Sequence, residues 1–250
     1  MEEKKKIIVV DRLRREFVVG GERVKALRGV SFTIHEGEFV TIMGTSGSGK
    51  STLLNLLGCL DTPTSGEYVL DGVSVQKMSK NQRAVTRNRK IGFVFQNYNL
   101  LPKTTAIENV ELPLLYNSSV NATERLERAI KALEAVGLKE RLYHKSNQMS
   151  GGQQQRVAIA RALVNNPVII LADEATGNLD TRTSFSILTL FQRLHREGKT
   201  IIFVTHNPDL ALYSSRNIML RDGRITSDEY NHNIQSAEEA LRALPKDMDE

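Results

Sequence analysis

The sequence predicts an α/β fold with a mainly parallel sheet, an antiparallel β subdomain and an inserted α-helical subdomain. β-Branched runs alternate with helical patterns in the second half of the chain, which favours parallel strands joined by helices. A glycine- and serine-rich loop between a β-branched run and an apolar helix, residues 43–60, indicates the same arrangement. Turn residues between strand-like runs near the N-terminus favour the antiparallel part.

The composition is that of an ordinary globular protein. The 250 residues include 34 Lys plus Arg, 29 Asp plus Glu and 40% hydrophobic residues, which argues against disorder and coiled coil. The lone Cys59 cannot form an internal disulfide. The longest apolar runs, residues 168–172 and 201–204, are far below the roughly 18 residues needed to span a bilayer. Since the N-terminal apolar run is too short for a signal peptide, we expect a cytoplasmic protein without a membrane anchor of its own.

The first part of the chain is predicted to form strands. β-Branched or aromatic runs occupy residues 6–11, 17–19, 30–34 and 38–43. Turns are expected between these runs, at Gly20-Gly21 and Glu36-Gly37. A further hairpin over residues 68–75 is predicted to close at Asp71-Gly72.

The middle of the chain is predicted to be helical. Over residues 121–137 an apolar stripe recurs at helical spacing, Asn121 with Glu124 resembles a capping box, and Gly137 suits the C-terminal stop. The members of the stripe are Leu126, Ala129, Ile130, Leu133 and Val136.

Strands and helices are expected to alternate after this helix. The chain pattern predicts helices over 152–164 and 183–196, strands over 168–172 and 201–205, and a hairpin at Asp222-Gly223. The polar tail contains one short candidate helix, capped by Ser236 and Glu239 and ending before Pro245. No role for the tail follows from its sequence.

One glycine-rich loop has the residues of a phosphate site. It fits G-x-x-x-x-G-K-[ST] between a predicted strand and a predicted helix. Its glycines let backbone N–H groups face phosphate oxygens, Lys50 reaches the β- and γ-phosphates, and the Ser51 hydroxyl can ligate Mg²⁺. The pattern predicts a P-loop NTPase (RecA-like) core that binds a nucleotide and Mg²⁺, and by itself it does not separate a kinase, a GTPase and a motor ATPase. The predicted binding residues here are Gly44, Thr45, Ser46, Gly47, Ser48, Gly49, Lys50, Ser51 and Thr52.

A second part of the site is predicted at the end of the apolar strand before residue 173. Asp173 would reach the metal at the carboxyl edge of the sheet, where open α/β sheets bind their ligands. Glu174 would then orient or deprotonate the water that attacks the γ-phosphate. These two acids, together with the phosphate loop, indicate NTP hydrolysis.

A second glycine loop separates this chain from most other phosphate-loop proteins. Met149-Ser150-Gly151-Gly152-Gln153 leads into a helix, and its free N–H groups form another anion site about 100 residues after Lys50. This segment resembles the signature of the ATP-binding cassette (ABC) ATPase family, which usually has Leu where this chain has Met149. We call residues 149–153 the signature loop. The resemblance covers roughly residues 5–227, and little consequence is expected from the apolar Leu-to-Met exchange.

The resemblance implies further site residues, in the order in which the family has them. Gln96 would sense Mg²⁺ and the γ-phosphate, Asp180 would cross a dimer interface, and the switch residue His206 would hold the γ-phosphate. Phe17 lies where the family has an aromatic residue that stacks on adenine, with Val24 as its small apolar neighbour. By this resemblance, Lys50, Glu174 and His206 are the catalytic residues, and Ser51, Gln96 and Asp173 hold the metal.

The resemblance also implies the partners. Ser150, Gly151, Gly152, Gln153 and Asp180 would act on the nucleotide of a second copy, which gives an ATP-dependent homodimer. Residues 96–102, with Tyr98, Leu100 and Leu101, would dock an integral-membrane permease, which holds the protein at the inner face of the cell membrane. Through that permease a periplasmic or extracellular adaptor is implied.

Residues 1–230 are expected to form a single domain. Its ATP-binding core would span 1–95 and 157–230, the helical subdomain with the signature loop 96–156, and the tail 231–250.

The motifs around residues 58–67, 153–156 and 176–180 resemble one branch of the family. That branch includes macrolide and peptide exporters, the lipoprotein-releasing ATPase and the cell-division ATPase. Ala175 departs from the usual Pro, which should relax the backbone after Glu174 and alter the hydrolysis rate. The choice between an exporter and a mechanotransmission system stays open.

A basic band between Asp71 and Glu108 suits an alternative function. It has seven Lys or Arg residues and no acid, so a nucleic-acid face, an anionic membrane or an acidic partner would each fit. The alternative is a non-transport ABC ATPase acting on nucleic acid. Such proteins usually carry a long insertion or two cassettes, which this chain lacks, so no nucleic acid is expected as a partner. The band comprises Lys77, Lys80, Arg83, Arg87, Arg89, Lys90 and Lys103.

Overall fold

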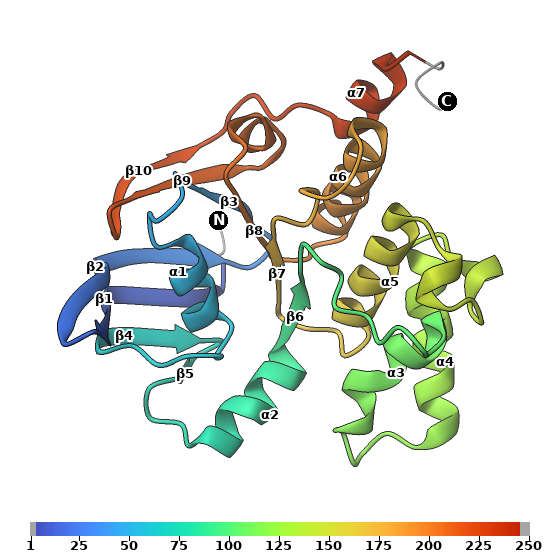
Figure 1. The fold of residues 1–250 in the computed structure, drawn as a ribbon, viewed down its shortest axis with the longest axis horizontal. Coiled ribbons are helices and arrows are strands. Elements are labelled where there is room, and N and C mark those ends of the chain that lie inside the picture. The colour runs from blue at the N-terminus through green and yellow to red at the C-terminus, as the bar shows by residue number, and fades with distance from the viewer. Residues whose placement is uncertain (1–3, 246–250) are drawn as a thin grey trace.

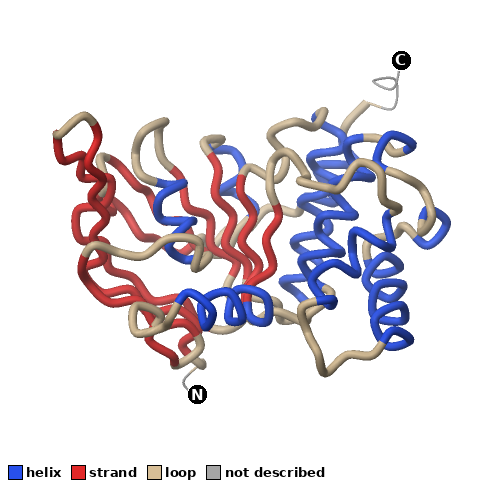
Figure 2. The backbone as a smooth tube through the Cα atoms, turned by 60° about the horizontal axis from the view of Figure 1, so that its bottom comes forward, coloured by secondary structure: helices blue, strands red, loops and turns tan. Residues whose placement is uncertain are grey.

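A computed structural model describes residues 4–245; the outermost residues of the predicted domain and tail, 1–3 and 246–250, lie outside the described part. Two sheets lie on one side of the molecule, and most of the helices pack on the other (Figures 1 and 2). This arrangement confirms the predicted α/β class. The subdomain boundaries remain predictions.

The larger sheet has six strands in the order β10-β9-β3-β8-β7-β6. The last five strands in this order, from β9 to β6, are parallel neighbours, and β10 pairs with β9 in antiparallel fashion. Side chains of β3 and β8 are buried along their whole length, which explains their unbroken apolar or β-branched sequences. The strands are β3 (Phe39–Met43), β6 (Ile91–Val94), β7 (Ile169–Asp173), β8 (Ile201–Thr205), β9 (Arg216–Arg221) and β10 (Arg224–Tyr230).

The smaller sheet is antiparallel, in the order β2-β1-β4-β5. The predicted separate runs over 6–11, 17–19 and 30–34 belong to two strands of 14 residues each. The charged stretches between those runs point to solvent, and β-bulges interrupt the register, so no apolar alternation marks them as strands. The predicted turns at Gly20-Gly21 and Asp71-Gly72 are confirmed. The strands are β1 (Lys6–Val19), β2 (Glu22–His35), β4 (Ser65–Leu70) and β5 (Val73–Ser74).

Residues 4–245 contain seven α-helices. The sequence pattern missed α2, because this helix buries no side chain and therefore has no apolar stripe; a capping box of Ser79 and Gln82 begins it. The helices are α1 (Lys50–Leu57), α2 (Lys80–Lys90), α3 (Ala106–Leu115), α4 (Ala122–Ala135), α5 (Gly151–Leu163), α6 (Thr181–Arg196) and α7 (Ala237–Ala243). Short 3-10 turns occupy Lys139–Arg141, Ser146–Gln148 and Pro208–Tyr213.

Helix α4 differs in two details from its prediction. Asn121 caps the helix by accepting a bond from the Glu124 backbone N–H at 3.0 Å, but the Glu124 side chain pairs with Arg128 instead of completing the capping box. Leu126 of the predicted stripe is 43% exposed. The rest of the stripe does pack inward, on α3 and α5.

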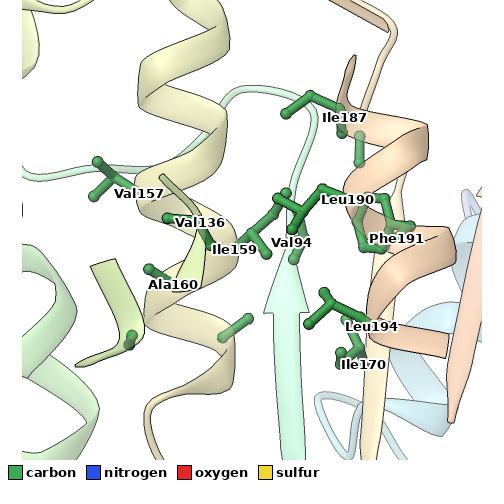
Figure 3. Close-up of a cluster of buried hydrophobic side chains, with 14 of the residues drawn as sticks. Val94, Val136, Val157, Ile159, Ala160, Ile170, Ile187, Leu190, Phe191 and Leu194 are labelled. Atoms are coloured by element: carbon green, nitrogen blue, oxygen red, sulfur yellow. The ribbon is translucent and has the colours of Figure 1, made fainter. Parts of the chain in front are cut away.

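Strand β7 separates two hydrophobic cores. Ile170 and Ala172 face a core shared with α3 to α6, in which Val94 of β6 lies between α5 and α6 (Figure 3). Ile169 and Leu171 face the other core, which contains α1 and the antiparallel sheet. Each large apolar side chain buried in this way stabilises the fold by roughly 1.5–3 kcal/mol. The strand is therefore fixed from both faces.

The tail packs against α6. Ser236 caps α7 by accepting a bond from Glu239 N–H at 3.2 Å, as predicted, and Ala237 is fully buried. Buried Gln192 of α6 donates to the carbonyl oxygens of Tyr213 and Gln235 and accepts from the Ala237 N–H. The tail is thus part of the described fold.

Candidate active site

Four adjacent parallel strands end at one edge of the sheet and carry the predicted catalytic segments. In spatial order they are β3, β8, β7 and β6, and their C-terminal residues pair directly, Met43 with Thr205 and Asp173 with Val204. The phosphate loop follows β3, His206 follows β8, Glu174 follows β7 and Gln96 follows β6. The topology therefore gathers segments that are up to about 160 residues apart in the sequence.

The phosphate loop needs its glycines for close backbone packing. Gly49 has φ +105°, and a Cβ there would lie 2.6 Å from the carbonyl oxygen of Ala26. A Cβ on Gly44 would lie 2.1 Å from the carbonyl oxygen of Leu220. Thr45, Ser46 and Gly47 between them are exposed, so the loop offers its outer side to a ligand.

Lys50 begins α1 and folds back over this loop. Its Nζ atom donates to the carbonyl oxygens of Gly44 at 2.7 Å and Thr45 at 3.0 Å, and the residue is only 9% exposed. Ser51 follows it on the exposed side of the first turn, and Thr52 is half-buried. The Ser48 hydroxyl is buried without a hydrogen-bond partner in the described structure. The ammonium group and the N-terminal end of α1 make this loop a site for anionic phosphate.

The two acids at the end of β7 have different surroundings. Burial and the neighbouring Glu174 carboxylate raise the pKa of Asp173, while the Lys50 cation lowers it. Glu174 has φ +45°, and its Oε1 lies 2.7 Å from Nδ1 of His206. Left-handed backbone is uncommon for a non-glycine residue and often marks a functional turn.

Gln96 lies against the turn that follows Glu174. Its Nε2 donates to Oδ1 of Asn178 at 3.2 Å, and Nδ2 of Asn178 donates to the Gln96 carbonyl oxygen at 3.3 Å. A Cβ on Gly177 would lie 2.8 Å from the Gln96 Nε2, so a larger residue there would displace the Gln96 side chain. Asn178 was not predicted as a site residue, although it lies within the motif of residues 176–180.

Phe17 and Val24 are direct cross-strand partners on β1 and β2. Val24 is 50% exposed and Phe17 is half-buried, so the pair offers a partly exposed apolar platform on the antiparallel sheet. The guanidinium carbon of Arg15 lies 4.5 Å from the centroid of the Phe17 ring, and Arg15 also pairs with Asp61 at 2.8 Å. Sequence reasoning missed Arg15, because its contact depends on the folded strand.

The signature loop lies on the opposite side of β7 from the phosphate loop. α5 packs in the core on one face of β7 and α1 in the core on the other. Ser150 and Gln153 form a capping box at the start of α5, and a Cβ on Gly151 would lie 2.8 Å from the Tyr98 hydroxyl. Asp180 is exposed and caps α6 through the Thr183 N–H at 2.8 Å; its bonds with Thr183 lower its pKa. The residues predicted to act in trans are therefore apart from Lys50.

Several residues of the basic band have partners inside the fold. Arg83 donates to the Met78 carbonyl oxygen at 3.2 Å, Arg87 donates to that of Cys59 at 3.1 Å, and Lys90 pairs with Asp71. The band is thus in part structural.

The comparison with known proteins decides the family. The model of the ABC transporter family matches residues 27–177. This chain belongs to the ABC transporter family. A cassette described as an uncharacterized ABC transporter ATP-binding protein of Thermotoga maritima is 56% identical over 225 residues, which are 90% of this chain and 96% of that protein. The family resemblance predicted from the motifs is confirmed.

Solved structures and longer relatives extend this result. The ATP-binding cassette MJ0796, solved as a dimer in a post-hydrolysis state with ADP and Pi, gives a TM-score of 0.82 at 46% identity and covers 90% of this chain and 99% of its own. The macrolide export ATP-binding/permease protein MacB of Syntrophobacter fumaroxidans is 53% identical over 88% of this chain, which spans only 31% of MacB. The present cassette is an ATP-binding and ATP-hydrolysing subunit of an ABC transporter. None of its helices in residues 4–245 is both long and apolar enough to traverse a bilayer.

Proposed function

We propose that two copies of this cassette close head to tail around two MgATP molecules and drive a separately encoded permease of the macrolide, peptide or lipoprotein type. The observation that carries the permease assignment is an apolar groove beside the Gln96 loop. The assignment of the individual site residues follows from the edge of the sheet described above.

The residues at that edge fit a nucleotide with a divalent ion. Lys50 and the loop N–H groups of residues 44–52 would hold the β- and γ-phosphates, and Phe17 with Val24 would support the adenine. Ser51, Asp173 and Gln96 offer the few oxygen ligands that Mg²⁺ needs beside phosphate oxygens and water. When bound, the ion would neutralise charge on the β- and γ-phosphates. The orphaned Ser48 hydroxyl and the glycine-lined cradle support this fit.

Hydrolysis would depend on the pair formed by Glu174 and His206. The Glu174 carboxylate would accept a proton from the attacking water, and His206 would hold the γ-phosphate. In the described structure His206 contacts the carboxylate itself. The two side chains are therefore in position to act on the same group.

The second copy supplies the other side of the nucleotide. Ser150, Gly151, Gly152, Gln153 and Asp180 lie apart from Lys50, and Ser150 and Asp180 are exposed. The free N–H groups at the start of α5 form an anion site that a partner's γ-phosphate would fill. A C2 dimer makes two such composite sites at once. The dimeric form in which MJ0796 was solved supports this arrangement.

The groove has a volume of about 900 Å³ and lies between α2, β6, α3 and α5. Apolar and aromatic side chains from all of these parts line it, with Arg87, Arg89 and Arg161 among them. A short amphipathic helix of a membrane subunit suits a groove of this kind. Apolar lining residues include Val85, Phe93, Phe95, Leu101, Pro113 and Tyr116.

The loop predicted to dock the permease divides between two environments. Leu101 lines the groove, while Leu100 packs against the internal core. The Tyr98 hydroxyl lies beside Gly151, and Arg161 holds the Tyr98 carbonyl oxygen at 2.7 Å. We therefore assign docking to Leu101 and the α2 side of the groove rather than to Tyr98.

The relatives support a permease as the partner. MacB is described as a combined ATP-binding and permease protein, and this chain matches about a third of it. The permease, and any periplasmic or extracellular adaptor reached through it, would here be separate chains. Bound to it, the cassette would lie at the inner face of the cell membrane.

The test compares two exposed valines. Val85→Glu places a charge in the groove, where Val85 is 51% exposed, and Val73→Glu places one on β5, where Val73 is 47% exposed. We expect Val85→Glu to abolish co-purification with a co-expressed permease partner and to keep the basal ATPase of the isolated cassette. Val73→Glu should keep both. Equal co-purification of the two variants would remove the groove as the docking site.

A further inference from the structure

We infer that Gln155 is a positioning residue that connects the signature loop of a protomer to that protomer's own catalytic glutamate. The inference rests on the proposed roles of Glu174 and of Ser150 to Gln153. Gln155 lies on α5, two residues after the signature loop, and is fully buried. Its Nε2 donates to the carbonyl oxygen of Ala175 at 2.6 Å.

The amide of Gln155 is poorly suited to a purely structural role. Its Oε1 is buried and has no hydrogen-bond partner in the described structure. Leaving a buried acceptor unpaired is unfavourable, whereas an apolar side chain of similar volume would fill the same space without that loss. The favourable interaction that the amide does make here is the hydrogen bond from its Nε2 to the Ala175 carbonyl oxygen.

The acceptor of that bond belongs to the turn that orients Glu174. Ala175 is 2% exposed and follows Glu174, whose φ is +45°. The Gly177 N–H donates to the Glu174 carbonyl oxygen at 2.9 Å, which closes the turn. On its other side the turn is held by Gln96 through Asn178. A strained turn of this kind keeps its shape only while its partners stay in place.

Movement of α5 would therefore reach the catalytic base. The signature loop is the first turn of the same helix, and a helix transmits displacement as a rigid element. When the loop engages the γ-phosphate of the partner's nucleotide, the position of Gln155 determines where the Ala175 carbonyl oxygen lies. Because Ala175 follows Glu174 directly, this also determines the orientation of the Glu174 side chain. Nucleotide in one composite site would in this way set the geometry of the base in the other, which is a coupling between two sites.

Gln155→Met tests this link, because Met has a similar volume and cannot donate a hydrogen bond. We expect kcat to fall about tenfold, ATP affinity of the monomer to stay within about twofold, and the Hill coefficient of ATP hydrolysis to fall to about 1 from a wild-type value between 1 and 2. ATP titration and steady-state hydrolysis on the full chain measure all three. Should this variant fail to fold, Gln155→Asn withdraws the amide by one methylene and is expected to show the same loss of cooperativity.

The matched control is Gln192→Met. Gln192 is also a buried glutamine that donates to backbone carbonyl oxygens, but it holds the tail rather than the catalytic turn. We expect it to lower thermal stability while kcat and the Hill coefficient stay at wild-type values. A merely structural Gln155 would behave like Gln192, and an unchanged Hill coefficient in the Gln155 variants would overturn the inference.

Failure of the inference can be told apart from failure of the proposed function. If Glu174→Gln retains hydrolysis, the proposed base is wrong. If Glu174→Gln is inactive and the Gln155 variants retain cooperative hydrolysis, the base stands and the link through Gln155 falls.

Discussion

Nδ1 of His206 lies 2.7 Å from Oε1 of Glu174, between residues that follow neighbouring strands of the parallel sheet. The His206 side chain is 64% exposed and that of Glu174 is 23% exposed, so the contact lies at the mouth of the site. The imidazole engages one oxygen of the Glu174 carboxylate. This geometry leads to the first prediction.

Replacing Glu174 by Gln should remove hydrolysis and preserve ATP binding. The amide keeps the size of the side chain but does not accept the proton of the attacking water. Lys50→Ala should instead lose binding, because the cation on the phosphates is gone. Nucleotide titration and phosphate release on both variants separate the two roles. A Glu174→Gln rate above roughly a tenth of wild type would disqualify Glu174 as the base, since general bases contribute far more than tenfold.

Mixing two inactive variants should restore activity. Ser150→Arg inactivates the signature loop and Lys50→Ala inactivates the phosphate loop. A mixed dimer nevertheless keeps one composite site in which the signature loop and the phosphate loop are both intact. Random pairing leaves roughly a quarter of all sites intact in a C2 dimer, so we expect turnover above that of either variant and at most about a quarter of the wild-type value. Each variant alone is the control. A further measurement is ATP hydrolysis by the wild-type protein at decreasing concentration. If the rate stays proportional to protein concentration down to nanomolar levels, and the protein is a monomer throughout, the two-chain site is contradicted.

Asp173→Asn should stabilise the nucleotide-free protein while abolishing hydrolysis. The pKa of Asp173 is raised, so the fold disfavours its charged form at neutral pH. For an acid with a raised folded pKa, stability increases as pH falls through that pKa towards 3.8, and the advantage of Asn should shrink over the same range. A gain of about 1 kcal/mol would raise Tm by roughly 2–4 °C for a chain of this size.

The control for this stability effect is Asp222→Asn, at a surface turn where the side chain is 79% exposed. Thermal melts at pH 7 and pH 4 of both variants and the wild type provide the comparison. A lower Tm for Asp173→Asn at pH 7 would show that the charge of Asp173 is stabilising.

Arg15→Ala should weaken ATP binding without slowing the chemical step. Its guanidinium carbon lies 4.5 Å from the centroid of the Phe17 ring and the group is itself held by Asp61, so Arg15 supports the ring on which the base would stack. Loss of a cation–π contact of ~0.5–1 kcal/mol predicts a rise in KM of about twofold to fivefold at unchanged kcat. Arg12→Ala, at an exposed position of the same strand, is the control. A fall in kcat with constant KM would assign Arg15 to another step.

The sequence was most informative where chemistry follows a buried strand. The phosphate loop, Asp173, Glu174, Gln96 and His206 each come after a short apolar run, and parallel strands bring such segments to one edge. The signature loop was identifiable because two glycines precede a helix. These signals are local, so they can be read along the chain.

The features that were missed depend on contacts between distant segments. Asn178 meets Gln96 across 82 residues, and the bond from Gln155 spans 20. Helix α2 has no buried side chain, and long stretches of β1 and β2 are charged, so hydrophobic periodicity gives no signal in α2 or in those stretches. The outward position of Leu126 is likewise set by the packing of α4 rather than by its spacing.

Alternate side chains of β7 face two different cores, and this restricts insertions and deletions in the strand. Adding or deleting one residue within the strand would exchange Ile169 and Leu171 with Ile170 and Ala172, so that each set faced the wrong core. The same insertion or deletion would shift Asp173 and Glu174 by one residue along the strand relative to Lys50 and His206. An insertion or deletion in this strand would therefore destabilise the fold in addition to any effect on hydrolysis. The packing of the β7 side chains in this way keeps Asp173 and Glu174 in their positions at the end of the strand.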